Sequence, residues 1–397
     1  MKLLSVDAAR ARMLAHVRPL ATESIALEVG LGRVLAEELR AVRDQPPFAA
    51  SAMDGWAVRA EDTPARLAIV GESAAGHAFA GSVGKREAAR IFTGAPMPAG
   101  ADAVVIQEDA VRDGESVTVP AVRAGRHVRA AGMDFRAGDE LLARGDRLDP
   151  WRLALAAAAG RSQLCVSRQP RVAILATGEE IVPPGGVARA DQIFDSGSAS
   201  LAALVSTCGG RPETLGRVGD DEGAIAEMAA RAGGDLLVTL GGASVGDHDL
   251  VKPALARLGL QLAVESVAVR PGKPTWFGVL ADGKLVLGLP GNPASAMVCA
   301  ELFLRPLLAA LQGADPALRL ITTRVGGALR ANGEREQWLR ATLSSLPTGD
   351  VVATPLPDQD SSLVMVFAAA DCLVRRPPGA AAAEVGDPVE VLPLPRL

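Results

Sequence analysis

Three stretches of this sequence decide its fold: RVAILATGEE (residues 171–180), DLLVTLGGASVG (235–246) and KLVLGLPGNPASAMVCAELFLRPLLAAL (284–311). Each contains an apolar run that passes at once into a loop with glycines. Strands that are buried on both faces of a sheet have such unbroken runs, and their alternation with helical stretches is typical of a parallel sheet. We therefore predict an α/β domain with a parallel sheet over residues 169–316.

The segments on either side of this domain have different patterns. Residues 45–135 contain short apolar runs broken by Gly, Pro and Asp, such as RLAIVGES (66–73), which predicts a small inserted β-rich domain. Helical spacing in 5–17, 31–41 and 148–160 predicts a helical linker and dimerisation region from residues 1–44 and 136–168, with Ser5 and Asp149 as N-caps. Short β-like runs over 317–397 predict a C-terminal β-barrel.

Composition narrows the classes of function. The chain of 397 residues has 41 Lys and Arg against 46 Asp and Glu, a net charge of −5, which argues against a nucleic-acid-binding surface. Its 4 Cys form no C-x-x-C pair, which argues against a disulfide framework or a zinc ribbon. The charged N-terminal stretch is typical of an amphipathic helix, and no apolar run reaches about 18 residues. We expect a cytoplasmic protein that binds neither nucleic acid nor membrane.

The candidate ligand site lies where the predicted parallel strands end. Ligands bind there because the loops lead into helix N-termini, whose free N–H groups attract anions. Gly241 and Gly242 let the backbone approach a phosphate, and Ser244 follows in the same loop. Asn292 is the expected N-cap of the third helix, and it places Ser295 in the first turn.

Charged residues near these loops indicate an anionic ligand and a cation. Arg270 and Lys273 lie on the proline-stiffened loop RPGKP (270–274), which suits an oxyanion or a phosphate; a solvated basic turn is the alternative. Carboxylates repel phosphates unless a cation lies between them, so the acidic residues indicate Mg²⁺. The acidic candidates are Glu180, Asp220, Asp221, Asp247 and Asp249, with Asp54 and Asp134 from outside the α/β domain.

Two stretches have the residue spacing of well-known functional motifs, but the residues in and around them do not suit those functions. GESAAGH (71–77) has the glycine spacing of a P-loop, but His77 stands where the phosphate-binding Lys belongs, so a Walker-type ATPase is not predicted. GASVG (242–246) has the spacing of a nucleophile elbow, which leaves a serine hydrolase as an alternative. That alternative is weak, because the one later histidine, His248, lies in the same loop.

Seven motifs occur in order along the chain: SAMDG (51–55), TGAPMP (93–98), GMD (132–134), TGEE (177–180), GGASVG (241–246), PGKP (271–274) and LPGNPAS (289–295). Together they closely resemble the molybdopterin molybdenumtransferase family, and the resemblance spans nearly the whole chain. It implies an elongated homodimer whose subunits have the four structural parts predicted above. It also implies that adenylylated molybdopterin and molybdate react, with Mg²⁺, to give molybdenum cofactor and AMP.

The resemblance implies roles for individual residues. Catalytic roles fall on Asp54, Thr93, Asp134, Glu180, Asp221 and Asp249, the last three also being the implied metal ligands. Substrate-binding roles fall on Ser196, Gly241, Gly242, Ser244, Arg270, Lys273, Asn292, Ser295 and Arg335. The inserted-domain residues are expected to reach the α/β cleft of the partner subunit. The chain departs from the family pattern at Gly197, Ser266 and Asp360, where the family usually has Asn, a basic residue and Gly.

Two other functions remain as alternatives. A molybdopterin adenylyltransferase needs only a compact α/β unit, which leaves the SAMDG motif and the flanking domains unexplained. A non-enzymatic scaffold on the same domains is expected to carry long linkers or partner-binding insertions, and the sequence has neither. Expected partners are a second copy of the chain, the molybdopterin adenylyltransferase and the proteins that mature molybdoenzymes.

Overall fold

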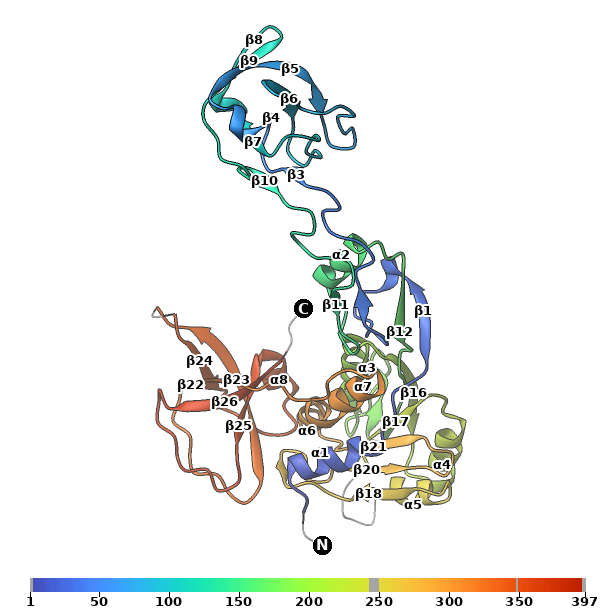
Figure 1. Cartoon of the computed structure of the whole chain (residues 1–397). Helices are drawn as coiled ribbons and strands as arrows, with labels where there is room; N and C mark the ends of the chain where they lie inside the picture. The colour runs from blue at the N-terminus through green and yellow to red at the C-terminus, as the bar shows by residue number, and fades with distance from the viewer. Residues whose placement is uncertain (1–2, 243–249, 348, 395–397) are drawn as a thin grey trace.

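The computed structural model describes residues 3–242, 250–347 and 349–394. The molecule is elongated: the inserted domain projects at one end, and the α/β domain and the C-terminal barrel lie side by side at the other (Figure 1). Two connecting segments lead to the inserted domain. They pair with each other, through β3 (Ala50–Ser51) and β10 (Val128–Arg129), where they enter it.

The α/β domain is built on a six-stranded sheet with the strand order β16-β13-β17-β21-β20-β18. These strands are β16 (Arg211–Val218), β13 (Arg171–Thr177), β17 (Leu236–Leu240), β21 (Leu285–Leu289), β20 (Trp276–Val279) and β18 (Gln261–Val264). The first four are parallel, which confirms the predicted fold class, and at one edge β20 runs antiparallel to β21 while β18 runs antiparallel to β20. The apolar runs of β13, β17 and β21 are buried, as predicted.

Helices cover both faces of this sheet. On one face lie α1 (Val6–Leu14), α3 (Ser196–Thr207), α6 (Pro293–Cys299) and α7 (Arg305–Leu311); on the other lie α4 (Glu222–Arg231) and α5 (Val251–Ala256). Val172 and Ile174 of β13 belong to the first core, and Ala173 and Leu175 belong to the second. Alternate side chains of one strand therefore serve opposite cores, as the two-residue repeat of a strand requires.

One helical stretch of the described chain is long and apolar enough to cross a membrane, by length and composition alone. It runs over Pro293–Leu311, through α6, a π-helical turn (Ala300–Leu304) and α7, with a mean hydropathy of 1.6. However, 78% of this window is buried inside the protein, where it packs in the first core of the α/β domain. It is a core helix of that domain.

The region between the α/β domain and the inserted domain mixes helix and strand. It contains α2 (Pro150–Ala158), η1 (Leu27–Val29), the pair β1 (Thr22–Ala26) and β12 (Gln163–Ser167), and the pair β2 (Leu39–Arg40) and β11 (Glu140–Leu142). Asp149 caps α2 as predicted. The helix predicted over 31–41 is wrong: Val34 and Leu35 form bridges to Arg147 and Val166, because tertiary pairing overrides the local helical spacing. The helix predicted at 5–17 exists as α1, but it packs in the α/β core.

The two remaining domains are β-structures. The inserted domain has a six-stranded sheet in the order β7-β4-β6-β5-β9-β8. Its elements are β4 (Gly55–Val58), η2 (Ala60–Asp62), β5 (Ala65–Ser73), β6 (Glu87–Ile91), β7 (Ala103–Ile106), η3 (Gln107–Asp109), β8 (Val111–Asp113) and β9 (Ser116–Val119).

The C-terminal domain is a closed barrel, as predicted. Its strands are β22 (Ile321–Val325), β23 (Glu336–Ser345), β24 (Val351–Pro355), β25 (Cys372–Arg376) and β26 (Pro388–Pro393), with α8 (Val364–Ala369) beside them. The ring closes because β23 pairs with both β24 and β25. β19 (Val269–Arg270) leaves the α/β domain and pairs with β23, so the two domains are joined through backbone hydrogen bonding.

Candidate functional site

A cavity of about 860 Å³ opens where three parallel strands of the α/β domain end. Thr177 ends β13, Leu240 ends β17 and Leu289 ends β21, and the loops that follow all contribute to the cavity wall. Among its lining residues are Gly178, Glu180, Asp195, Ser196, Asp220, Gly241, Gly242, Asn292 and Ser295. The structure therefore brings the predicted glycine loops together at one edge of the sheet.

The glycines of these loops are there for close packing and backbone conformation. Gly241 and Gly242 have φ of +89° and +58°, in the left-handed region. A Cβ on Gly241 would lie 2.7 Å from the carbonyl oxygen of Thr177, and one on Gly242 would lie 3.2 Å from its hydroxyl. Gly178 has φ of +127°. Larger residues here would strain the backbone and crowd neighbouring loops, so the cavity edge stays bare backbone.

The segment after β13 does not lead directly into a helix. The chain forms a small parallel pair, β14 (Ile181–Val182) with β15 (Ile193–Phe194), before α3 begins. Ser196 is the first residue of α3 and lines the cavity, and Asp195 caps the helix by accepting from Ser198 N at 2.8 Å. The N-terminus of a 12-residue helix therefore faces the cavity, where its dipole favours an anion.

The predicted acidic residues occupy different places. Glu180 and Asp220 line the cavity. Asp221 is the N-cap of α4, and its Oδ1 accepts from Ala224 N at 2.6 Å. Asp249 lies outside the described residues, as does Ser244. The described chain has no group of three His, Cys, Asp or Glu side chains that could hold a metal. Hard carboxylate oxygens nevertheless fit a Mg²⁺ that takes one or two protein ligands and completes its shell with substrate phosphates and water.

A second, basic pocket of about 310 Å³ adjoins the cavity, and the two share Pro274 and Ser295. Its lining includes four cationic residues: Arg270, Lys273, Arg335 and Arg340. None of the four forms a salt bridge to any described residue. The β19–β23 pairing sets Arg270 beside Gln337 in register, so the first two cations come from the α/β domain and the last two from the barrel.

The backbone of the loop that carries Arg270 and Lys273 is held by hydrogen bonds and by contact with α6. The hydroxyl and N–H of Thr275 donate to the carbonyl oxygen of Gly272 at 2.8 and 3.0 Å. The buried thiol of Cys299, on α6, donates weakly to the carbonyl oxygens of Pro271 and Gly272 at 3.9 and 3.8 Å. Burial raises the pKa of Cys299 to about 12, so this thiol stays neutral. The loop therefore holds its two cations on a fixed backbone.

A barrel loop ties the basic pocket to the start of α6. Ala294 N donates to the carbonyl oxygen of Ser361 at 3.0 Å, and Asn292 Nδ2 donates to Ser361 Oγ at 2.9 Å. Asn292 has the backbone position of an N-cap, as predicted, but its side chain makes no capping hydrogen bond within α6. Ser295, in the first turn, is buried and lines both hollows. The cavity and the basic pocket therefore share one continuous wall, which crosses the boundary between the α/β domain and the barrel.

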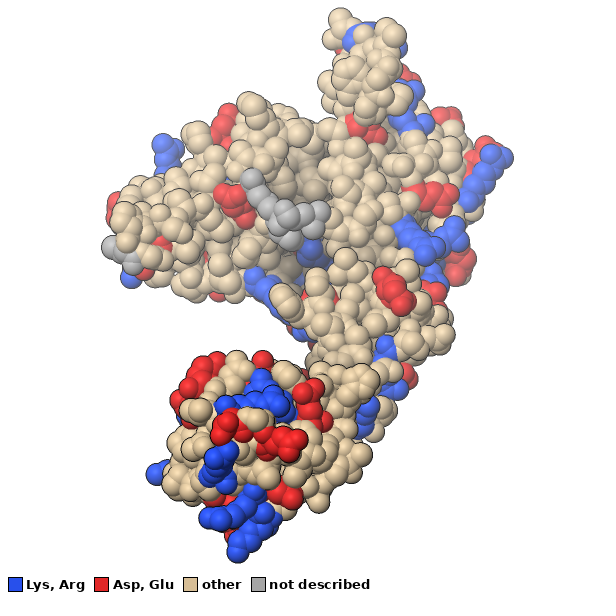
Figure 2. Space-filling model, turned by 90° about the horizontal axis from the view of Figure 1, so that it is seen from above, with Lys and Arg blue, Asp and Glu red and all other residues tan. Residues whose placement is uncertain are grey.

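The inserted domain, which carries Asp54 and Thr93, projects away from the α/β domain and the barrel of the same chain (Figure 1). Asp54 Oδ1 accepts from Thr93 N at 2.7 Å and from Thr93 Oγ1 at 2.8 Å, and these hydrogen bonds hold the pKa of Asp54 below its ordinary value. Asp134 lies in a connecting segment, where its N–H donates to the carbonyl oxygen of Gln45. Open space separates the inserted domain from the C-terminal barrel in both views (Figures 1 and 2).

Sequence reasoning missed two contributors to the basic pocket. Arg340 lies close in sequence to the predicted Arg335, but only the barrel register of β23 brings it to the pocket lining. Ser361 had no distinguishing pattern, and it meets Asn292 from 69 positions further along the chain. Of the departures from the expected pattern, Gly197 has a packing reason, since a Cβ there would overlap the side chain of Leu240. Asp360 forms a local turn by accepting from Ser362 N and Oγ.

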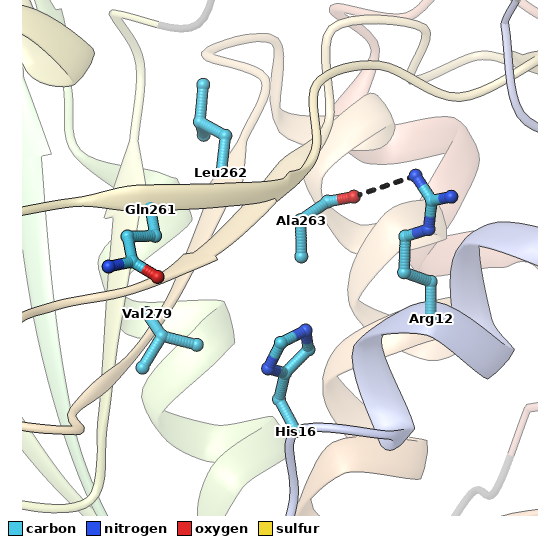
Figure 3. A pocket seen from close by; sticks show the side chains of 6 residues that line it. All are labelled: Arg12, His16, Gln261, Leu262, Ala263 and Val279. Atoms are coloured by element: carbon cyan, nitrogen blue, oxygen red, sulfur yellow. Dashed lines mark hydrogen bonds between the residues drawn. The ribbon is translucent and has the colours of Figure 1, made fainter.

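A separate hollow of about 440 Å³ lies between the end of α1 and the edge strand β18 (Figure 3). It is lined by Arg12, His16, Gln261, Leu262, Ala263 and Val279. Arg12 Nη1 is turned to the carbonyl oxygen of Ala263, to which it donates at 3.3 Å. None of the predicted site residues lines this hollow, and no glycine loop or helix start enters it.

Comparison with known families covers nearly the whole chain. Residues 4–160 match the family described as MoeA N-terminal region (domain I and II). Residues 173–310 match the one described as "Probable molybdopterin binding domain". Residues 322–394 match the MoeA C-terminal region (domain IV).

Several whole proteins are similar as well. The chain is 40% identical to the molybdopterin molybdenumtransferase of Synechococcus elongatus over 78% of this chain and 80% of that one. It is 32% identical to the Bacillus subtilis protein of the same name over 98% and 94%. Among solved structures, the molybdopterin biosynthesis moea protein from Pyrococcus horikosii superposes with a TM-score of 0.83, at 33% identity and with both chains fully covered.

Proposed function

The chain belongs to the MoeA family of molybdopterin molybdenumtransferases, and we propose that it inserts molybdate into adenylylated molybdopterin, releasing AMP and giving molybdenum cofactor. It is a transferase of molybdenum cofactor biosynthesis. The observation that carries the detailed assignment is the continuous wall formed by the glycine-loop cavity and the basic pocket. This wall supports the proposal, because the reaction needs two neighbouring anion sites of unequal size.

The larger cavity is the proposed place of adenylylated molybdopterin. Its diphosphate bridge would lie against the backbone of Gly241 and Gly242 and near the N-terminus of α3, where N–H groups and the helix dipole favour negative charge. Ser196 and Asn292 offer polar side chains at the same wall. At about 860 Å³ the cavity falls in the size range of small-molecule and cofactor sites.

The basic pocket is the proposed place of molybdate. Molybdate is a tetrahedral dianion, and charge-assisted hydrogen bonds from Arg and Lys are the strong way to bind one. Arg270, Lys273 and Arg335 line the pocket without carboxylate partners in the described chain, and Ser295 stands between them and the cavity. The four residues would hold the oxyanion beside the adenylylated substrate.

The chemistry follows from this placement. An oxygen of water or of molybdate attacks the adenylyl phosphorus, and the bond from that phosphorus to the molybdopterin phosphate oxygen breaks. AMP then leaves; where the attacking oxygen came from molybdate, water first hydrolyses the molybdate–AMP anhydride. Molybdate then bonds to the two dithiolene sulfurs of molybdopterin, and one of its oxygens leaves as water with the two thiol protons. Such transfers depend on positioning and on stabilising charge, and Lys273, which lines the basic pocket next to the shared Pro274, would provide that charge. No covalent nucleophile of the protein is needed.

A magnesium ion would neutralise the phosphate oxygens during this transfer. Glu180 and Asp220 line the cavity and are the described residues placed to hold it. Asp221 and Asp249 remain predicted ligands. The first of them would have to serve beside its role as the N-cap of α4. Chelation of the metal is expected to abolish AMP release, and added Mg²⁺ is expected to restore it.

We further propose that the active form is a cytoplasmic homodimer in which the inserted domain of one subunit completes the cavity of the other. Asp54, Thr93 and Asp134 would then act at the partner's site, since the inserted domain projects away from the α/β domain of its own chain (Figure 1). Mixing the inactive variants Asp54→Ala and Lys273→Met tests this. Subunit exchange should restore about a quarter of wild-type activity, because half of the dimers are mixed and each has one intact site. Absence of any recovery places Asp54 in its own chain's site.

The reaction itself is tested by incubating the protein with adenylylated molybdopterin and Mg²⁺, with and without molybdate, and measuring AMP. Molybdate-dependent release is expected for wild type and for Lys85→Met, a control that removes an exposed lysine of the inserted domain. Lys273→Met should lose it. Formation of adenylylated molybdopterin from ATP would instead indicate an adenylyltransferase, and neither activity would indicate a scaffold. The adenylyltransferase and molybdoenzyme-maturation proteins are the proposed partners, as the suppliers of substrate and the receivers of product.

A further inference from the structure

We propose that Arg90 is a positioning residue of this reaction: its guanidinium holds the backbone beside Asp54 and so fixes the Asp54–Thr93 pair for the site that it completes. The inference rests on the proposed function, since it takes Asp54 as a residue that acts on the substrate. Arg90 itself lies outside the seven sequence motifs and has no role in the assignments above.

The place of Arg90 on the sheet of the inserted domain is the first observation. Arg90 lies on β6, directly opposite Trp56 on β4, and is partly buried (Figure 1). The central carbon of its guanidinium lies 5.4 Å from the ring centre of Trp56 and 4.8 Å from that of Phe92. A cation within about 6 Å of an aromatic ring centre is attracted to the ring. The two aromatic rings therefore hold the guanidinium over this face of the sheet.

The hydrogen bonds of Arg90 connect it to the backbone around Asp54. Its Nη1 donates to the carbonyl oxygen of Gly55 at 3.0 Å, and its Nη2 donates to Oε1 of Gln107 at 2.7 Å. Gly55 directly follows Asp54, and Gln107 N donates to the carbonyl oxygen of Asp54 at 3.0 Å. The planar fork of an arginine suits such a double contact. One guanidinium thus joins the two segments that carry and oppose Asp54.

The backbone at Gly55 is confined on its other side as well. A Cβ on Gly55 would overlap the carbonyl oxygen of Val105, so β4 packs closely against β7 at this point. The side chain of Asp54 accepts both of its hydrogen bonds from Thr93, which follows β6 in the sequence. The carboxylate is therefore held through its side chain by Thr93 and through its backbone by Gln107 and Arg90.

The positive charge of Arg90 also acts on Asp54. Arg90 forms no salt bridge to any carboxylate of the described residues. The two hydrogen bonds from Thr93 are the main reason why the pKa of Asp54 lies below its ordinary value, and the charge of Arg90 lowers it further. Arg90 therefore makes two contributions, one through hydrogen-bond geometry and one through charge, and substitutions can separate them.

A neighbouring arginine shares the packing of Arg90 but lacks its hydrogen bonds. The guanidinium carbon of Arg112, on β8, lies 5.9 Å from the ring centre of Trp56, and its Nε donates to the carbonyl oxygen of Gly114. If Arg90 served only to pack on Trp56, replacing either arginine should have similar effects. If Arg90 positions Asp54, replacement of Arg112 should leave Asp54 and the reaction unchanged.

The test measures the kinetics of AMP release by the full chain with adenylylated molybdopterin, molybdate and Mg²⁺, and the pKa of Asp54 by NMR titration without substrate. Arg90→Met should lower kcat about 10- to 100-fold and leave KM for adenylylated molybdopterin unchanged, because the pair it positions acts in the transition state. It should also raise the pKa of Asp54. Arg90→Lys keeps the charge and loses the fork, so it should leave that pKa near the wild-type value while kcat stays lowered. Arg112→Met, the matched control, should behave as wild type in both measurements.

Several results would overturn the inference. Wild-type kcat in Arg90→Met does so, as does an unchanged pKa of Asp54 in that variant. If Arg90→Met does not fold, wild-type kcat in Arg90→Lys has the same meaning. An equal loss of kcat in Arg112→Met assigns the effect to packing on Trp56 and also overturns the inference.

The variant Asp54→Ala separates this failure from a failure of the proposed function. Full AMP release by Asp54→Ala removes the proposed role of Asp54, and the inference falls with it. Loss of release in Asp54→Ala together with full release in Arg90→Met overturns the inference alone and leaves the proposed function standing.

Discussion

Gly272 lies between the two cations of the loop RPGKP, and its replacement by alanine tests whether the loop is held from below. Its φ is +114°, and a Cβ there would overlap Sγ of Cys299, far inside the 3.0 Å that real Cβ atoms essentially never cross. Cys299 cannot turn away, because it is fully buried beneath the loop. Alanine must therefore displace the loop, the helix α6 or both.

The expected loss of stability in Gly272→Ala is the sum of two separate costs. Overpacking a filled interior costs about 1–3 kcal/mol, and a non-glycine residue in a sparsely populated backbone conformation costs about 1–3 kcal/mol. Gly272→Ala is expected to lower the free energy of unfolding by roughly 2–6 kcal/mol if the loop stays in place. The part relieved by movement of the loop should instead appear as weaker molybdate binding, because Arg270 and Lys273 move with it.

A double variant separates the two costs. Cys299→Ala removes Sγ, so the packing part, about 1–3 kcal/mol, should be recovered in Gly272→Ala/Cys299→Ala, while the backbone part remains. Urea denaturation of wild type, both single variants and the double variant gives the coupling between the two positions, and titration with molybdate follows the loop. Purely additive effects of the two substitutions on unfolding would refute the packing of Cys299 against the loop.

Three further predictions concern single side chains. Asp221→Ala should lower the free energy of unfolding by about 1 kcal/mol, because it removes the N-cap of α4. Asp221→Ser keeps a cap but removes the carboxylate, so loss of AMP release in this variant, with unchanged urea unfolding, identifies Asp221 as a metal ligand. Full activity of the serine variant excludes that role. Thr93→Val should raise the pKa of Asp54, because it removes one of the hydrogen bonds that lower that pKa. In wild type the contribution of Asp54 to stability should be present above its ordinary pKa and lost as pH falls through the lowered pKa. NMR titration of Asp54 in both proteins measures the shift, and an unchanged titration midpoint in Thr93→Val contradicts the prediction. Cys299, with its pKa raised to about 12 by burial, should resist iodoacetamide in the folded protein while the partly exposed Cys165 reacts, as mass spectrometry of the labelled protein would show; equal labelling contradicts the burial.

Sequence patterns predicted those elements whose conformation is settled locally or by complete burial. The apolar runs of β13, β17 and β21 are long enough to exclude a half-exposed strand, and the Asp149–Pro150 pair marks the start of α2 without reference to any other part of the chain. The segment 31–41 failed for the opposite reason. Its apolar spacing suits a helix, but distant pairing partners decide its conformation, and spacing cannot reveal them.

Some residues of the candidate site could likewise be predicted from the sequence, and others could not. The need for glycine at Gly241 and Gly242 was readable, because clustered glycines signal a left-handed backbone or close approach. Arg340 and Ser361 were not readable as site residues, since the barrel must close before its β23 and the loop after β24 meet the α/β domain. Asp221 shows a further limit, because an acidic residue beside a predicted anion site can also be a helix cap.

We propose that the glycine-loop cavity and the basic pocket form one site with two compartments. Crystals grown with AMP and molybdate, measured by anomalous diffraction at the molybdenum absorption edge, test it most directly. We expect a molybdenum peak among Arg270, Lys273, Arg335 and Arg340, with the AMP phosphate at Gly241 and Gly242 in the adjoining cavity. A molybdenum peak in any other part of the molecule, with the basic pocket empty, would contradict it.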